Sequence, residues 1–274
     1  MRAIFSSMDI RQSMNFWEEI ANATQKREKL VVITVVKDNG SVPRRTGAKM
    51  LVFSDGTASG TVGGGLFEAL VIKDALKSLD ERKSKTISYS FNPEGTNPQA
   101  FGAICGGRAD IFFEVIMPKD TLLIVGGGHC GRALAKMASL LDFSIIICDD
   151  REEFIKTEDF DFPNIEQTLH LPANFEGLPI PDENTYVALV SKGFVTDEAA
   201  LRRVLETPAA YIGMIGSRRK RDVVFENLRK DGISEETLAR VHSPIGLNIG
   251  AETPEEIAVS ILAEIIQERT GDKK

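Results

Sequence analysis

The spacing of hydrophobic positions divides the chain into two stretches with different rhythms. Between residues 30 and 117, short apolar runs rich in Val, Ile and Phe are bounded by Gly and Asp, as in β-strands, and one helical pattern over 66–79 lies among them. Ahead of these runs, Asp9 is placed to cap a helix with an apolar face made of Ile10, Met14, Trp17 and Ala21. Because strands and helices do not alternate here, the pattern predicts an α+β domain over residues 1–118.

After Pro118 the pattern becomes regular. Short apolar runs alternate with helical patterns, and these runs cover residues 121–126, 144–149, 186–191 and 210–216. A turn-rich segment is predicted between the second and third runs, and a capping box at Thr253 opens the last helix. Strands that alternate with helices form a doubly wound parallel sheet with ligands at its carboxyl edge. The sequence therefore predicts an α/β protein with a C-terminal Rossmann-like domain over residues 119–274.

The composition is that of an ordinary globular protein, with 42% hydrophobic and 27% charged residues among 274. The net charge of −7 argues against nucleic acid as the main partner, because nucleic-acid binding proteins concentrate Lys and Arg on one face. No apolar run approaches the ~20 residues that span a bilayer, and the N-terminus lacks the apolar core of a secretion signal. The three cysteines contain no Cys-x-x-Cys pair. These features predict a cytoplasmic protein with no membrane partner, no disulfide framework and no metal site.

The first strand of the second domain runs directly into Gly126-x-Gly128-x-x-Gly131 and then into a helix. Glycines at this spacing let backbone N–H groups approach a phosphate, and the helix adds its positive N-terminal end. His129 lies inside the turn, and Asp149 ends the second strand, where a carboxylate can accept from a ribose hydroxyl. The motif predicts a nucleotide-like ligand, and tight helix–strand packing is the alternative.

Two of the cysteines are candidates for chemistry. Cys105 precedes two glycines that let a ligand or a transferable sulfur come close, whereas its alternative is a small buried thiol. Cys130 falls in the first turn of the glycine-loop helix, where the helix dipole is expected to lower the pKa of a thiol. Cys148 alternates with core residues and is expected to be inert packing.

Two loops of the N-terminal stretch also suit anions. In GSVPRRTG, a proline fixes the chain before paired arginines, and in GTVGGG three glycines open a helix that carries a glutamate in its first turn. A solvated arginine and a flexible hairpin are the alternatives. The candidate binding residues of these loops are Arg44, Arg45, Gly63, Gly64, Gly65 and Glu68.

Further candidates lie at the carboxyl edge of the predicted sheet. Ser217 caps a helix that begins with the basic run Arg218 to Arg221, whose first residues could supplement a phosphate site, although such a run is usually a solvated face. His242 lies in a loop predicted to be near the same edge, whereas His170 is interpreted as an ordinary solvated residue.

These stretches together resemble the XdhC/CoxI family, accessory proteins that mature molybdenum hydroxylases such as xanthine dehydrogenase. The resemblance covers nearly the whole chain and rests on GSVPRRTGAKM, GTVGGG, CGG at Cys105, GGGHCGRALA, DDR, YIGMIGSRRKR and RVHSPIGLNIGAETPEEIAVSILAEI. It implies that the protein binds molybdenum cofactor, as molybdopterin or its dinucleotide form, protects it while its terminal sulfido ligand is installed, and passes it to an apo-hydroxylase. On this interpretation Cys105 is a molybdenum-side thiol or sulfur relay, and glycine loops of both domains grip one extended ligand.

A carrier of this kind needs little acid–base chemistry, so the resemblance implies a maturation chaperone rather than a turnover enzyme. Its expected partners are an apo molybdenum hydroxylase and a second copy of itself, with a cysteine desulfurase as a further candidate. Two alternatives stay open. An NAD(P)-dependent oxidoreductase predicts a catalytic residue near the nicotinamide, for which only His242 applies, and a nucleotide-sensing regulator predicts nucleotide affinity without pterin affinity.

Overall fold

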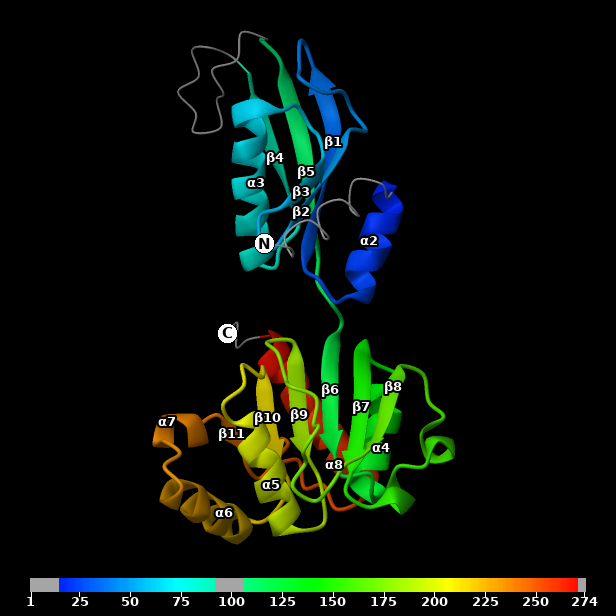
Figure 1. Ribbon diagram of the computed structural model, residues 1–274, viewed down its shortest axis with the longest axis vertical. Helices are drawn as coiled ribbons and strands as arrows, with labels where there is room; N and C mark the ends of the chain where they lie inside the picture. The colour runs from blue at the N-terminus through cyan, green and yellow to red at the C-terminus, as the bar shows by residue number, and fades with distance from the viewer. Residues whose placement is uncertain (1–14, 92–105, 271–274) are drawn as a thin grey trace, which may run out of the picture. The chain divides into compact units, whose positions relative to one another are not determined.

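The computed structural model describes residues 15–91 and 106–270, and the chain divides into two compact units, Met1–Pro118 and Lys119–Lys274. Figure 1 shows the elements of both units. The fold is the expected α/β mixture of one antiparallel and one parallel sheet. None of the helices within the described ranges is long and apolar enough to cross a membrane.

The N-terminal unit is a five-stranded antiparallel sheet with the order β3-β2-β1-β5-β4. One face packs against α3 through Phe67 and Val71, and the other packs against α2 through Ala23. Val31 and Ile33 point to the first face and Leu30 and Val32 to the second, so both faces of β1 are buried. The elements are α2 (Phe16–Gln25), β1 (Leu30–Asn39), β2 (Lys49–Phe53), β3 (Ala58–Gly60), α3 (Gly65–Asp80), β4 (Lys85–Ser90) and β5 (Arg108–Ile116).

The apolar face predicted for the first helix is wrong. Asn15 is the N-cap of α2, where its side chain accepts from the Trp17 N–H at 2.9 Å and its own N–H donates to Glu18 at 3.0 Å. This capping box sets a non-helical backbone at Asn15, so α2 begins at Phe16. Phe16, Ile20 and Ala23 face the sheet instead, and Trp17 is 63% exposed. The predicted Asp9 cap lies outside the described residues.

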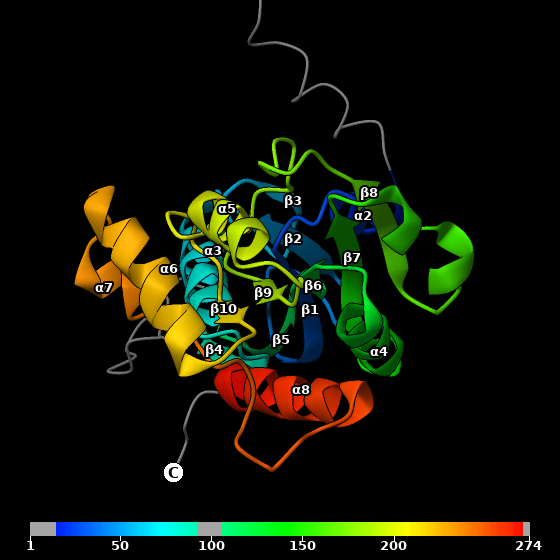
Figure 2. The same ribbon diagram turned by 90° about the horizontal axis from the view of Figure 1, so that it is seen from below.

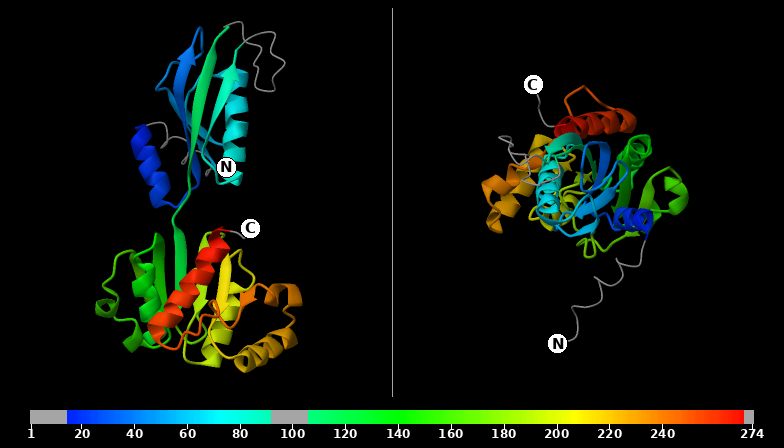
Figure 3. Two further views of the ribbon diagram at one scale, coloured as in Figure 1. Left: turned by 180° about the vertical axis from the view of Figure 1, so that it is seen from behind. Right: turned by 90° about the horizontal axis from the view of Figure 1, so that it is seen from above.

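The C-terminal unit is a six-stranded parallel sheet with the order β11-β10-β9-β6-β7-β8. Helices α4 and α8 cover one face, and α5 and α6 cover the other (Figure 2; Figure 3, left). The elements are β6 (Asp120–Val125), α4 (His129–Ala138), β7 (Phe143–Asp149), the short 3-10 turns Glu152–Phe154 and Thr157–Phe160, β8 (Ile165–His170), β9 (Thr185–Leu189), α5 (Phe194–Val204), β10 (Tyr211–Met214), α6 (Arg218–Lys230), α7 (Glu235–Leu238), β11 (Val241–His242) and α8 (Pro254–Thr270).

Strand β8 lies in the segment that the sequence predicts to be turn-rich. It pairs only with β7, and none of its six residues is fully buried. An edge strand of this kind carries polar side chains such as Glu166 and Gln167, so the apolar run that marks the central strands is missing.

The order of the strands positions the site. From the central strand β6 the chain proceeds outward through β7 and β8 on one side, and returns to build β9, β10 and β11 on the other. The crossover helices then lie on opposite faces, so the switch point of the topology, where open α/β sheets bind their ligands, lies between the carboxyl ends of β6 and β9. The glycine-rich motif follows β6 directly, so the fold places it at this switch point.

Candidate functional site

Three of the four glycines in the turn after β6, residues 126–131 (the glycine turn), are required by packing. A Cβ on Gly131 would lie 1.8 Å from the carbonyl oxygen of Gly126, and one on Gly127 would lie 2.0 Å from the carbonyl oxygen of Phe154. Gly126 has a φ of +118° and would meet the Ser191 N–H at 2.7 Å. These glycines let α4 and the loop after β9 approach the turn closely, which is the alternative that the sequence left open.

Gly128 differs from its neighbours. It has an ordinary φ of −69°, and a Cβ there would meet nothing within 4 Å. Gly128 is the N-cap of α4, the first turn of this helix carries no acidic residue, and His129 is exposed there. The first N–H groups of a helix have no intrahelical acceptor, and they carry the positive end of its dipole. The open space at Gly128 therefore faces backbone donors suited to a phosphate.

Asp149 supports the glycine turn from beneath. Its side chain is 1% exposed, and its carboxylate accepts from the Gly127 N–H at 2.8 Å and from Nε and Nη2 of Arg151, both at 2.9 Å. Burial raises the pKa of Asp149, but the hydrogen bonds from Arg151 and Gly127 outweigh it and the pKa lies below its usual value. Arg151 in turn stacks on Phe154, with 4.0 Å to the ring centroid. Both carboxylate oxygens are thus engaged within the chain, and acceptance from a ribose hydroxyl stays a prediction.

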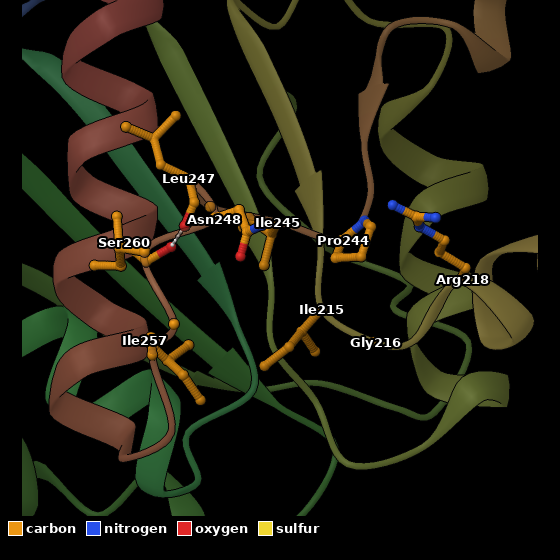
Figure 4. A pocket seen from close by; sticks show the side chains of 13 residues that line it. Ile215, Gly216, Arg218, Pro244, Ile245, Leu247, Asn248, Ile257 and Ser260 are labelled. Carbon is orange, nitrogen blue, oxygen red and sulfur yellow. Dashed lines mark hydrogen bonds between the residues drawn. The ribbon is translucent and has the colours of Figure 1, made fainter.

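A cavity of about 550 Å³ opens beside the carboxyl end of β10 (Figure 4). One wall is the loop over residues 244–251, another is α8 at Ile257 and Ser260, and Arg218 borders it at the start of α6. We call it the loop cavity. Ser260 Oγ donates to the Leu247 carbonyl at 2.6 Å, which ties the loop to the helix. Only β9 separates β6 from β10, so the carboxyl ends of these strands lie about 10 Å apart at the same sheet edge.

Sequence reasoning missed the loop cavity and a buried polar cluster after β9. Asp197, which is fully buried, accepts hydrogen bonds from Ser191 and from the ammonium of Lys220. Burial raises the pKa of the Asp197 carboxyl, although the bonds from Lys220 and Ser191 act in the opposite direction. The run SPIGLNIGA could have indicated the cavity, because Gly246 and Gly250, with φ of +92° and +75°, bend a loop that a generic dinucleotide fold does not need.

Ser217 and Arg218 lie where the sequence predicts. Ser217 caps α6 by accepting from the Lys220 N–H at 3.3 Å, and Arg218 is exposed at the loop cavity. His242 is not in a loop, because it pairs with Gly213 in the short strand β11. Its Nδ1 lies 3.5 Å from Glu264 Oε1, and this carboxylate raises the pKa of the imidazole. His242 is thus held by α8 through an ion pair that the sequence does not indicate.

The prediction of a lowered pKa at Cys130 is wrong. Burial raises the pKa of this half-buried thiol, and the negative charge of Glu255, at the start of α8, raises it further. Burial and the charge of Glu255 therefore set the direction of the shift, opposite to the one expected from the helix dipole. Cys148 is buried in the core as expected.

Alkylation should report the state of Cys130. A thiolate is the reactive form, so we expect iodoacetamide to modify Cys130 slowly at pH 7.5 and to require a higher pH than a free cysteine. Glu255→Gln removes the negative charge and should speed the reaction at pH 7.5 severalfold while leaving the burial in place. Peptide mass spectrometry measures the rate at this residue alone. An E255Q rate equal to the parent rate would contradict the role of Glu255.

The loops of the N-terminal unit are partly occupied by the chain itself. Arg45 Nη1 lies 2.8 Å from Asp38 Oδ2, and the hydrogen bonds from Thr46 and Arg45 lower the pKa of Asp38 to about 2. Arg44 is exposed and makes no ion pair with a described residue. Of the two predicted arginines, only Arg44 is therefore available to a ligand without breaking an internal bond.

Glu68 fills the backbone cradle predicted at Gly63, Gly64 and Gly65. Its Oε1 accepts from the Gly64 N–H at 2.8 Å and from the Gly63 N–H at 3.3 Å, and Thr61 also donates to it. Burial raises the pKa of Glu68, but these hydrogen bonds outweigh it and keep the group ionised. The anion at these two N–H groups is the protein's own carboxylate, so Gly63 and Gly64 are not free to donate to a ligand as the sequence suggests.

Cys105, the predicted sulfur-handling residue, lies outside the described residues. The glycine turn, Asp149, Ser217 and Arg218 gather at one edge of the parallel sheet, whereas Arg44, Arg45 and the Gly63–Gly65 loop belong to the other unit. No group of three or more His, Cys, Asp or Glu residues within 15–91 and 106–270 is arranged to hold a metal ion.

The chain is similar to several known proteins. It is 38% identical to the uncharacterized protein YqeB of Escherichia coli over 93% of this chain, and it spans 46% of YqeB. It is 22% identical to a probable xanthine dehydrogenase subunit of Bacillus subtilis, over 93% of this chain and 98% of that protein. It is 23% identical to the E. coli molybdenum cofactor insertion chaperone PaoD, over 87% of this chain and 83% of PaoD.

A solved structure supports the fold, and two family models match the chain. The structure, described as a xanthine dehydrogenase from Bacillus halodurans, superimposes with a TM-score of 0.51 at 22% identity, over 95% of this chain and 97% of that one. The model of the XdhC Rossmann domain matches residues 122–265, which include the glycine turn and the loop cavity, and the model of the XdhC and CoxI family matches residues 23–90. The chain therefore belongs to the XdhC and CoxI family.

Proposed function

We propose that this protein is an accessory factor that binds molybdenum cofactor, protects it during sulfuration and delivers it to an apo molybdenum hydroxylase such as xanthine dehydrogenase. The observation that carries the proposal is the open position at Gly128, beside free helix donors and at the same sheet edge as the loop cavity. The names of two relatives, a molybdenum cofactor insertion chaperone and a probable xanthine dehydrogenase subunit, support the same assignment.

The residues at this edge fit such a cargo. Its phosphate would accept from the N–H groups at the start of α4, in the space that a side chain at position 128 would fill. Its pterin would enter the loop cavity, where Ile215, Ile245 and Ile257 give an apolar surface and Asn248 offers a polar side chain. The chain would thus supply binding and exclusion of water, and the redox chemistry belongs to the cofactor and its hydroxylase.

Finer steps of the proposal rest on the sequence. Cys105 handles the sulfido ligand, with a cysteine desulfurase as the sulfur source, and Arg44 contributes from the N-terminal loop. We also propose, from the sequence, that the protein forms a homodimer and that it binds the dinucleotide form of the cofactor.

The geometry favours a carrier over an NAD(P)-dependent oxidoreductase. The carboxylate that would accept from the ribose already accepts four hydrogen bonds, from the Gly127 N–H and from the backbone and guanidinium of Arg151. A ribose hydroxyl would have to break one of them in order to bind there.

Anaerobic purification tests the proposal. Protein made in cells that synthesise molybdenum cofactor should release a fluorescent pterin on denaturation and oxidation, in an amount approaching the amount of protein. The released material is identified by mass, which also distinguishes the pterin form from the dinucleotide form. Protein that carries NAD(P) or another nucleotide, but no pterin, would overturn the proposal in favour of an oxidoreductase or a nucleotide sensor.

A further inference from the structure

A second cavity, on the α5–α6 side of the parallel sheet, has a basic lining. Its volume is about 390 Å³, and it is lined by Lys192, Phe194, Ser217, Arg219, Lys220 and Val223. We call it the basic cavity. Three of these six side chains are cations and none is acidic, although the whole chain has a net charge of −7. The protein is negative overall, yet positive charges cluster at this cavity. Such a local cluster favours an anionic ligand.

The cations of the basic cavity differ in how they are held. The ammonium group of Lys220 is held in place by its ion pair with the fully buried Asp197. Lys192 and Arg219 are exposed and make no ion pair with any residue in the described ranges. Two positive charges thus stay uncompensated beside an anchored third one, an arrangement suited to a phosphate that accepts several charge-assisted hydrogen bonds.

The apolar part of the lining narrows the class of anion. Phe194 is 51% exposed and Val223 is 45% exposed, and both border the same cavity as the cations. An inorganic phosphate would gain nothing from an exposed aromatic ring, whereas a nucleobase gains by stacking on it. Ser217 adds a hydroxyl at the mouth.

We propose that the basic cavity is a second ligand site, which binds a nucleoside 5′-phosphate with the phosphate on Lys192, Arg219 and Lys220 and the base against Phe194. The site is separate from the loop cavity. Arg218 borders the loop cavity, whereas Arg219 and Lys220 border the basic cavity, so the first turn of α6 stands between the two. The inference does not depend on the identity of the cargo at the glycine turn.

Titration of the full-length protein with the four common nucleoside 5′-monophosphates, by calorimetry at low and high salt, tests this site. We expect saturable binding that weakens with salt, and much weaker binding of the matching nucleosides, which lack the phosphate. Lys192→Gln combined with Arg219→Gln removes two exposed charges without disturbing the core, and it should weaken binding by about a hundredfold, roughly tenfold for each charge-assisted bond. Lys136→Gln, which removes one positive charge on α4 at the opposite face of the sheet, should leave the affinity unchanged.

Phe194→Ala separates a nucleotide site from a simple phosphate site. It should weaken nucleotide binding by about tenfold and leave the affinity for inorganic phosphate unchanged. The proposal fails if no monophosphate binds, or if the K192Q/R219Q protein binds as the parent does, since the nucleotide would then lie elsewhere. Equal affinity for inorganic phosphate and nucleotide, or an F194A affinity equal to that of the parent, would also overturn it.

Discussion

Gly131→Ala is expected to lower the free energy of unfolding of the C-terminal domain by about 3 kcal/mol or more. The new Cβ would lie 1.8 Å from the Gly126 carbonyl oxygen and 2.9 Å from its carbon, so the conflict is with backbone rather than with a flexible side chain. The peptide that carries this oxygen cannot move aside easily, because its N–H, that of Gly127, donates to the buried Asp149 carboxylate at 2.8 Å, and the preceding N–H, that of Gly126, donates to the Cys148 carbonyl at 2.7 Å. Urea denaturation followed by far-ultraviolet circular dichroism measures the change.

Gly128→Ala is the matched control for this measurement. It makes the same chemical change three residues earlier, where the Cβ meets nothing within 4 Å and φ is already −69°. We expect a cost of about 1 kcal/mol, because Ala is a poorer N-cap residue than Gly. Gly131, unlike Gly128, lies inside α4, where Ala is favoured over Gly by up to about 1 kcal/mol. The predicted loss at Gly131 is therefore what remains after this gain in helix propensity. Similar losses in the two variants would contradict the packing role assigned to Gly131.

The fold could be predicted from the sequence because its strongest patterns are local. Strands β6, β7 and β9 are buried on both faces, so each is a continuous apolar run. Such a run can be identified from its own sequence, without knowing which strands it pairs with. The prediction failed where local patterns compete. Asn15 and Glu18 close a capping box that sets the start of α2, and this box outweighs an apolar spacing that would have continued through it.

The site was harder to predict, because the sequence shows which groups are present but not which groups satisfy them. Glu68 and Asp149 were expected to face a ligand, yet each accepts from the very backbone N–H groups that the glycine motifs expose. The pairs Asp197–Lys220 and His242–Glu264 join residues that are distant in sequence. Only the packing of helices onto the sheet brings such partners together, so the pKa shifts of Asp197, His242 and Glu264 follow from tertiary structure.

Gly128→Leu is expected to abolish retention of the proposed cofactor, with at least about a hundredfold loss of affinity, while the domain stays folded. A Cβ at position 128 would meet nothing within 4 Å, and we expect the rest of the leucine side chain to occupy the approach to the N–H groups of α4. A phosphate that cannot reach these donors loses several charge-assisted hydrogen bonds, each worth about 1.5–3 kcal/mol. The pterin released per protein after anaerobic purification measures the loss.

The Gly128 series separates a ligand site from a packing motif, which Gly126, Gly127 and Gly131 cannot do. Substitutions at those three positions disturb the fold, so loss of cofactor in such variants would have two explanations. At Gly128 the size of the side chain alone should matter, because Ala leaves part of the space free and Leu fills it. We therefore expect retention of pterin to fall from Gly to Ala to Leu while the unfolding midpoint changes little. A G128L protein that folds and retains pterin as the parent does would show that the cofactor does not bind at the glycine turn.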